Sequence, residues 1–122
     1  NAVQVLSRLL RDGGLKNSLE FNRMITATYE ALANAVEHGN EGKKELDIHV
    51  HYQWCRGQLK VIIKDNGEGF DSKLVPNPLR PENLWKESGR GILIIRKYAD
   101  KLGFEEGGTR IIFEKDLSNL ID

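Results

Sequence analysis

The sequence predicts an α+β fold, because helical and strand periodicities follow one another along a single short chain. Hydrophobic residues recur at helical spacing over residues 2–12 and 18–38. Over residues 46–53 and 58–65 the period changes to two, which is typical of half-buried strands. At 122 residues, the chain is long enough to form one domain with a real hydrophobic core. We therefore expect helices and strands to pack together in one domain.

The two N-terminal helices are predicted from their hydrophobic positions and from the residues that begin and end them. Gly13 should stop the first helix. Asn17, followed three residues later by Glu20, predicts a capping box for the second helix, and Gly39 should end it. The hydrophobic residues expected to form the core stripe of the second helix are Phe21, Ile25, Tyr29, Leu32 and Val36.

The two predicted strands should form a hairpin whose side chains alternate between two faces. Arg56 and Gly57 lie between the strands and provide the turn. In the second strand, Asp65 has the same parity as the hydrophobic residues Val61 and Ile63. The carboxylate of Asp65 is therefore predicted to point to the apolar side of the sheet.

A zinc site on the first strand is an alternative interpretation of its polar residues. His49, His51 and Cys55 share one parity, so a strand could aim all three side chains the same way. A structural zinc ion needs four ligands, and no fourth ligand is spaced to join these three. Polar residues that alternate on an open sheet face explain the pattern without a metal.

The C-terminal half of the chain contains a long connection, a helix and a last strand. Residues 66–88 include every proline of the chain. A connection of this length inside a compact domain is usually a functional lid or a disordered segment. The following helix is expected to run from Gly89 to Leu102 and to stop at Gly103. A final strand over residues 109–113 closes the fold.

Composition and charge exclude several classes of function. Lys plus Arg number 18 and Asp plus Glu number 18, so no net charge favours nucleic acid or an anionic membrane. No apolar run approaches the roughly 20 residues of a membrane-spanning helix, and no signal-peptide pattern opens the chain. The single cysteine, Cys55, fits a reducing compartment. We expect a cytoplasmic protein that binds neither nucleic acid nor membrane.

Three polar residues of the second predicted helix form the first candidate motif. Glu30, Asn34 and His38 lie four residues apart, so they share one helical face. The positions between them are small or apolar, which stacks a carboxylate, an amide and an imidazole on a helix that otherwise looks buried. Buried polar groups need partners. For this motif alone, a capped helix end with solvated side chains is the simpler explanation.

Two glycine motifs follow in the chain. The sequence DNGEGFD starts at Asp65, where the second strand ends, and Gly67 and Gly69 would let the backbone approach a ligand closely. An inward carboxylate beside hydrophobic walls suits an exocyclic amine such as that of adenine. The sequence SGRGI, residues 88–92, opens a helix whose free N–H groups favour an anion. Each motif alone is also explained by an ordinary glycine turn.

In this order, E-x-x-x-N, D-x-G-x-G and G-x-G resemble the three nucleotide-binding boxes of the GHKL ATPases, the superfamily of gyrase and histidine-kinase catalytic domains. The stretches EALANAVEHGN, DNGEGFD and ENLWKESGRGILIIRKYADKL resemble the small bacterial anti-sigma-factor serine/threonine protein kinases. The resemblance implies a two-layer α/β sandwich, with a mixed, mostly antiparallel sheet covered on one face by about three helices. It also implies one ATP-binding kinase domain over residues 1–122, without the family's N-terminal strand, and an ATP lid at about residues 71–88.

The resemblance further implies a role for each matching residue. Glu30 would be the catalytic general base, and Asn34 would coordinate a magnesium ion bridging the ATP phosphates. Asp65 would bind the adenine amine. His38 would either cap the helix or contact the ligand. The residues implied to bind the nucleotide are Asn34, His38, Asp65, Gly67, Gly69, Lys86, Gly89, Arg90, Gly91 and Thr109.

The function implied by the resemblance is a Mg-ATP-dependent kinase that phosphorylates an anti-sigma-factor antagonist and also binds a sigma factor. A homodimer is the assembly it implies. Two alternatives stay open. One is a nucleotide-dependent interaction module without catalysis, which tests of Mg-ATP binding and phosphate transfer would distinguish. The other is the ATP-binding domain of a larger sensor or regulator, which fits a chain that begins with Asn1.

Overall fold

The computed structural model describes residues 1–36, 48–65, 87–105 and 110–121, and for residues 87–90 it describes the backbone only. The helices in these ranges are α1 (Ala2–Asp12), α2 (Ser18–Asn34) and α3 (Glu87–Tyr98). The strands are β1 (Ile48–Cys55), β2 (Gln58–Asp65), β3 (Lys101–Glu105) and β4 (Arg110–Asp116). A short 3₁₀ turn, Ser118–Leu120, follows the last strand.

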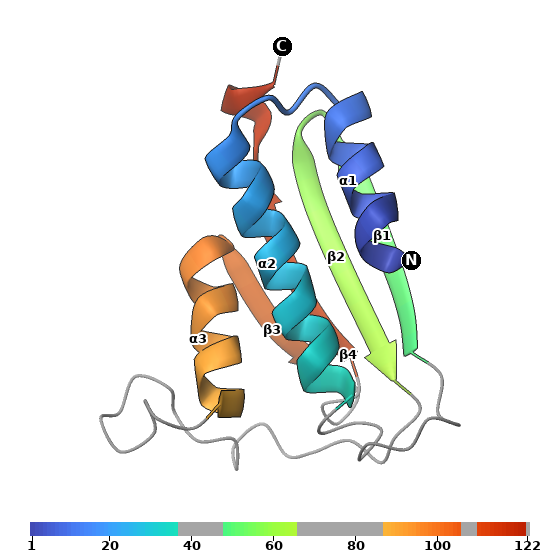
Figure 1. The fold of residues 1–122 in the computed structure, drawn as a ribbon, viewed down its shortest axis with the longest axis vertical. Helices are drawn as coiled ribbons and strands as arrows, with labels where there is room; N and C mark the ends of the chain where they lie inside the picture. The colour runs from blue at the N-terminus through green and yellow to red at the C-terminus, as the bar shows by residue number, and fades with distance from the viewer. Residues whose placement is uncertain (37–47, 66–86, 106–109, 122) are drawn as a thin grey trace.

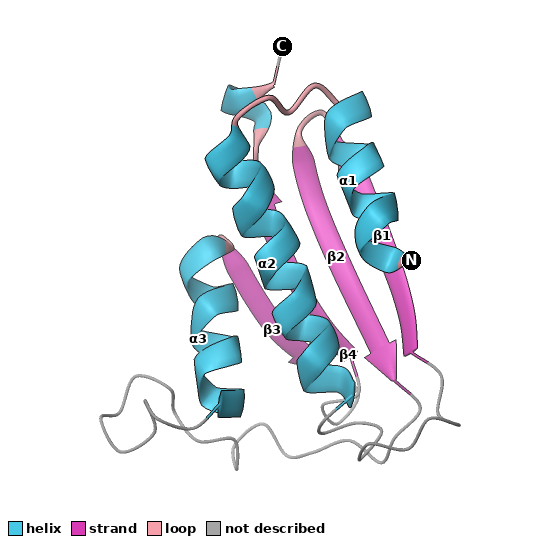
Figure 2. Ribbon diagram, in the orientation of Figure 1, coloured by secondary structure: helices cyan, strands magenta, loops and turns pink. Residues whose placement is uncertain are grey.

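The domain has two layers, because the strands form one sheet and all three described helices lie against one face of it (Figures 1 and 2). The strand order is β1-β2-β4-β3. Every pair of neighbouring strands in the described ranges is antiparallel. The α+β fold and the two-layer arrangement predicted from the sequence are confirmed.

One hydrophobic core lies between the helices and the sheet. Strand β1 alternates half-buried and exposed residues, and β2 buries every second residue from Leu59 to Asp65, as the period of two predicted. Ile62, of the other parity, is also buried because β2 is a central strand. Fully buried large side chains of the core include Leu6, Leu10, Met24, Leu59, Val61, Ile63, Ile95, Phe113 and Leu117.

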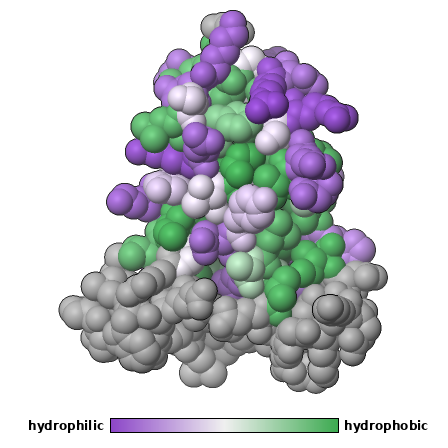
Figure 3. Space-filling view, in the orientation of Figure 1, coloured by the Kyte–Doolittle hydropathy of each residue, from purple (hydrophilic) through white to green (hydrophobic). Residues whose placement is uncertain are grey.

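The buried face of α2 differs from the predicted stripe. Tyr29 and Val36 are 56% and 46% exposed, so this part of the prediction was wrong. The residues that α2 buries are Met24, Ala27, Thr28, Ala31 and Asn34. Small side chains such as alanine let a helix backbone approach its neighbours closely, which leaves the bulkier residues to flank the contact. Figure 3 shows hydrophobic surface between α1 and α2.

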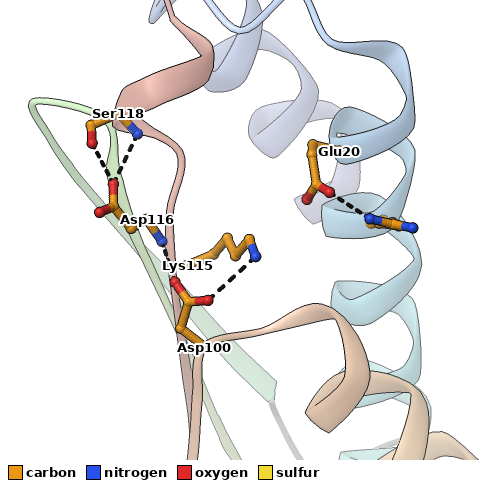
Figure 4. Close-up of polar contacts among 6 residues, drawn as sticks. Glu20, Asp100, Lys115, Asp116 and Ser118 are labelled. Carbon is orange, nitrogen blue, oxygen red and sulfur yellow. Dashed lines mark hydrogen bonds and ion pairs between the residues drawn. The ribbon is translucent and has the colours of Figure 1, made fainter.

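The end of α3 also differs from the prediction. The helix stops at Tyr98, and residues expected to continue it form β3, where Leu102 pairs with Phe113. Asp100 fixes this change of direction: its backbone N–H donates to the carbonyl oxygen of Glu114 at 2.8 Å. Its carboxylate accepts hydrogen bonds from the Asp116 backbone N–H at 2.7 Å and from Lys115 at 3.3 Å (Figure 4). Pairing with β4 therefore overrides the helical pattern.

The N-cap of α2 and the β1–β2 turn lie where the sequence predicted them, but only half of the predicted capping box forms, because the Glu20 carboxylate accepts a hydrogen bond from Arg23 at 2.6 Å instead. The side chain of Asn17 accepts a hydrogen bond from the backbone N–H of Glu20 at 3.0 Å and caps α2. Arg56 and Gly57 turn β1 into β2 with positive φ angles of 52° and 85°. Within the described ranges, no helix combines the length and the apolar character needed to cross a membrane.

Candidate functional site

The elements that carry the three sequence motifs converge at one end of the molecule. Helix α2 ends at Asn34, β2 ends at Asp65, and α3 begins at Glu87; all three ends lie on the lower side of the molecule in Figure 1. Helix α2 and strand β2 both run toward this end, whereas α3 starts there. Antiparallel packing thus brings together residues that are far apart in the sequence.

Asn34 is the buried polar residue at the end of α2. It is 5% exposed, and neither its side-chain oxygen nor its side-chain nitrogen has a hydrogen-bond partner among the described residues. An unpartnered buried polar group costs about 1–3 kcal/mol, so an orphaned amide of this kind points to a ligand. The amide oxygen is a hard donor, suited to a hard cation such as magnesium, and the amide nitrogen can donate a hydrogen bond.

Glu30 lies one helical turn before Asn34 and faces the start of α3. A Cβ atom built on Gly91 would lie 2.8 Å from the Oε2 atom of Glu30. Real Cβ atoms do not approach so closely, so the carboxylate lies directly against the glycine backbone. Glu30 is partly buried, and its carboxylate is placed between α2 and the first turns of α3. A carboxylate in this position can accept a proton or a hydrogen bond from a bound molecule.

Asp65 is the last residue of β2 and is 3% exposed. It pairs with Ile48 across the β1–β2 hairpin. It shares its face of the strand with Ile63 and Val61, both fully buried, as the sequence predicted. A carboxylate against an apolar wall at a strand end is a specific acceptor for a donor group on a ligand.

The remaining predicted site residues are placed only in part. Gly89 and Arg90 lie in the first turn of α3, where the backbone is described and the Arg90 side chain is not. The predicted site residues outside the described ranges are His38, Gly67, Gly69, Lys86 and Thr109. The structure thus brings Glu30 and Gly91 into contact, and it places Asn34 and Asp65 at the same end of the fold.

The zinc interpretation gains no support from the described part of the chain. His49 and His51 are exposed on β1, and Cys55 is exposed at its end. No group of three or more His, Cys, Asp or Glu side chains among the described residues is arranged to hold a metal ion. The alternating polar residues of β1 therefore lie on the exposed face of the sheet, and this explains the pattern without a metal.

The contact between Gly91 and Glu30 was not predicted from the sequence. The glycine was assigned only to a phosphate-binding helix start, and the glutamate only to a helix face. No local pattern reports that two residues 61 positions apart meet, because the distance between two helices depends on how both pack on the sheet.

Comparisons with known proteins identify the family of this chain. The family described as histidine kinase-like ATPase domain matches residues 1–115. An anti-sigma F factor of Clostridium botulinum is 33% identical over 108 residues, which cover 83% of this chain and 74% of that protein. The serine-protein kinase RsbW of Staphylococcus epidermidis is 28% identical over 109 residues, covering 83% of this chain and 67% of that protein.

A solved structure gives the same fold. The blue-light activated histidine kinase of Erythrobacter litoralis EL346 matches with a TM-score of 0.61 and 21% sequence identity. The match covers 82% of this chain but only 31% of that larger chain, and at this identity it supports the fold alone. From the match over residues 1–115 and the 33% identical relative, the chain belongs to the histidine kinase-like ATPase family and resembles the bacterial anti-sigma-factor kinases.

Proposed function

We propose that this domain is an ATP-dependent protein serine/threonine kinase of the anti-sigma type. The observation that carries the proposal is the buried amide of Asn34, which has no hydrogen-bond partner among the described residues and lies one helical turn after a carboxylate held at the start of α3. A metal-nucleotide site needs such a pair: an uncharged oxygen ligand and an acceptor for the proton of the attacking group. The printed names of the relatives, anti-sigma F factor and serine-protein kinase, support the same class.

The adenine end of ATP would be held at the end of β2. Asp65 would accept a hydrogen bond from the exocyclic amine, and its apolar neighbours on β2 would exclude water from the ring. Gly67 and Gly69 would shape this pocket, and Thr109 would assist at its edge. Specificity for adenine follows, because guanine carries an oxygen where adenine carries the amine.

The phosphates would lie between the ends of α2 and α3. Gly89 and Gly91 would let the start of α3 approach them, and backbone N–H groups there favour negative charge. Arg90 and Lys86 would add positive charge, and His38 would contact the ligand or cap α2. The amide oxygen of Asn34 fits a magnesium ligand, and the ion, when bound, would neutralise charge on the phosphates.

Glu30 would act as general base in the transfer step. A serine or threonine hydroxyl oxygen would bond to the γ-phosphorus while the bond from that phosphorus to the ADP oxygen breaks. The hydroxyl proton would pass to the Glu30 carboxylate, so the products are a phosphorylated protein and ADP. The placement of Glu30 at the start of α3, near the proposed phosphates, supports this role.

The protein substrate would be an anti-sigma-factor antagonist, and the kinase would also bind a sigma factor, in a partner-switching pathway in the bacterial cytoplasm. Phosphorylation would release the antagonist and leave the kinase free to hold the sigma factor. A homodimer is the assembly that we expect. The printed names of the relatives, anti-sigma F factor and serine-protein kinase, support a kinase of the anti-sigma class.

Labelled ATP tests the proposal directly. The chain is incubated with γ-labelled ATP, magnesium and purified anti-sigma-factor antagonist proteins, and phosphoserine or phosphothreonine is detected. We expect transfer by the wild type and a loss of about 100-fold or more for Glu30→Ala, a typical effect of removing a general base. Calorimetry should show that Asn34→Ala binds Mg-ATP more weakly. Binding without transfer would instead indicate a non-catalytic interaction module.

A further inference from the structure

Gly91 and Glu30 share a volume that only one side chain can occupy. The Cβ position of Gly91 lies 2.8 Å from the Oε2 atom of Glu30, whereas the Cδ and Cβ atoms of Glu30 are at ordinary contact distances of 3.8 and 3.9 Å. Only the carboxylate oxygen therefore conflicts with a side chain at position 91. Because Gly91 has no side chain, the carboxylate oxygen can occupy the space next to its backbone.

The kind of neighbour distinguishes Gly91 from two other glycines of the fold. A Cβ atom on Gly13 would meet the ring of Trp54 at 2.7 Å, and one on Gly57 would meet the Ser118 backbone at 2.5 Å. A ring or a backbone cannot swing away without repacking, so those two glycines are needed for stability. The Glu30 carboxylate ends a flexible side chain and can rotate away at little cost.

We propose that Gly91 is a positioning residue for the general base: its bare backbone seats the Glu30 carboxylate against α3. This inference rests on the proposed function, because it gives Gly91 a role in the kinase reaction other than phosphate binding. A methyl group at position 91 would displace the carboxylate, and we expect the fold to be kept, because the next nearest atoms are at 3.8 and 3.9 Å. A displacement of about 1 Å in a catalytic group can cost about 100-fold in rate.

Kinetics of Gly91→Ala test the proposal. In the antagonist assay, we expect kcat to fall by about 100-fold. The melting temperature should stay at its wild-type value, and the KM for ATP should change much less than kcat, because the new methyl group meets the Glu30 carboxylate. Gly103→Ala is the matched control: its Cβ atom would have no neighbour within 4 Å, and it should keep full activity. A Gly91→Ala variant with normal kcat, or with a raised KM as its main defect, would overturn the proposal.

A second variant separates positioning from phosphate binding. Glu30→Asp keeps a carboxylate but shortens the side chain by one methylene, which withdraws the oxygen from the Cβ position of residue 91. In the Glu30→Asp background, Gly91→Ala should cost less than about twofold in kcat, because the two changes share one contact. An undiminished loss in this background would show that Gly91 acts on the nucleotide, and the inference would fail.

An NMR measurement tests the contact without any enzymatic activity. The side-chain carboxyl resonance of Glu30 is assigned by its absence in Glu30→Ala and compared in ATP-free wild type, Gly91→Ala and Gly103→Ala. We expect it to shift in Gly91→Ala only. An unmoved resonance overturns the positioning role. A shifted resonance in a chain that transfers no phosphate keeps the contact and refutes the kinase assignment instead.

Discussion

Tyr52 connects the first strand to the first helix through a single polar contact. Its hydroxyl donates a hydrogen bond to the carbonyl oxygen of Ala2 at 2.7 Å. Burial raises the pKa of Tyr52 to about 12, because desolvation disfavours the phenolate. The folded-state pKa thus lies above the unfolded value of about 10. The resulting stability is fully present below about pH 10 and is lost as the pH rises toward the folded pKa.

In Tyr52→Phe, the free energy of unfolding should therefore fall less steeply with pH in the alkaline range than in wild type. At neutral pH the variant should lose about 1 kcal/mol, the usual contribution of one hydrogen bond. Between about pH 10 and pH 12, wild type should lose stability more steeply than the variant, because Phe has no proton to release. Denaturant unfolding across this window measures the difference. Tyr29→Phe is the control, since Tyr29 is 56% exposed; parallel curves for wild type and Tyr52→Phe would contradict the prediction.

At the scale of elements, the β1–β2 hairpin depends on the close contact between its turn and the end of the chain. Gly57 has a φ of +85°, and its carbonyl oxygen accepts a hydrogen bond from the Leu117 N–H at 2.8 Å. A Cβ atom there would lie 2.5 Å from the Cα atom of Ser118. Both the backbone conformation and the space require glycine.

Gly57→Ala should destabilise the domain by about 2 kcal/mol or more, because conformational strain adds to overpacking against a backbone. Urea unfolding monitored by circular dichroism measures the loss. Gly103→Ala in β3 is again the matched control, and its stability should equal or slightly exceed that of wild type, since its Cβ atom would meet no neighbour within 4 Å. Equal stabilities for the two variants would refute this account of the turn.

Elements whose pattern is local could be predicted from the sequence, and those decided by tertiary pairing could not. The N-cap of α2, the Arg56–Gly57 turn and the inward parity of Asp65 follow from residue type and spacing alone, whereas α2 already ends at Asn34 and the predicted stop at Gly39 lies outside the described residues. The end of α3 does not, because Leu102 fits a helical stripe and a strand equally well until it pairs with Phe113. The pairing of β3 with β4 joins separate segments of the chain, so the local sequence pattern of either segment cannot predict it.

The site was predictable to the same extent. The spacing of Glu30 and Asn34 places them on one helical face. In the structure they lie at the same end of the fold as Asp65. The small and apolar residues around Asn34 already suggested a buried polar stripe, but the predicted hydrophobic stripe of α2 was centred on larger residues such as Tyr29, which is exposed. Close helix packing through alanines decided the buried face instead.

At the scale of the whole molecule, the layer arrangement explains why the site lies where it does. All described helices lie on one face of the sheet, so α2 and α3 are neighbours and their opposite directions bring an end of one to the start of the other. Among the described residues the buried amide of Asn34 has no hydrogen-bond partner, and in the proposed function the bound ligand would remove this energetic cost. Ligand binding should therefore stabilise the entire domain.

On the proposed function, Mg-ATP should raise the melting temperature of the domain, because a ligand that binds only the folded state stabilises that state. At about 100 times its Kd the gain is about 2.7 kcal/mol, which for a chain of this size corresponds to a shift of about 10 °C. Asn34→Ala should lose most of the shift, and EDTA should reduce the shift of wild type. Glu30→Ala should keep the shift, because the proposed base would act on the attacking hydroxyl and not on nucleotide binding. A full, magnesium-independent shift in Asn34→Ala would mean that this amide does not hold the ion, and its buried, unpartnered atoms would need another ligand.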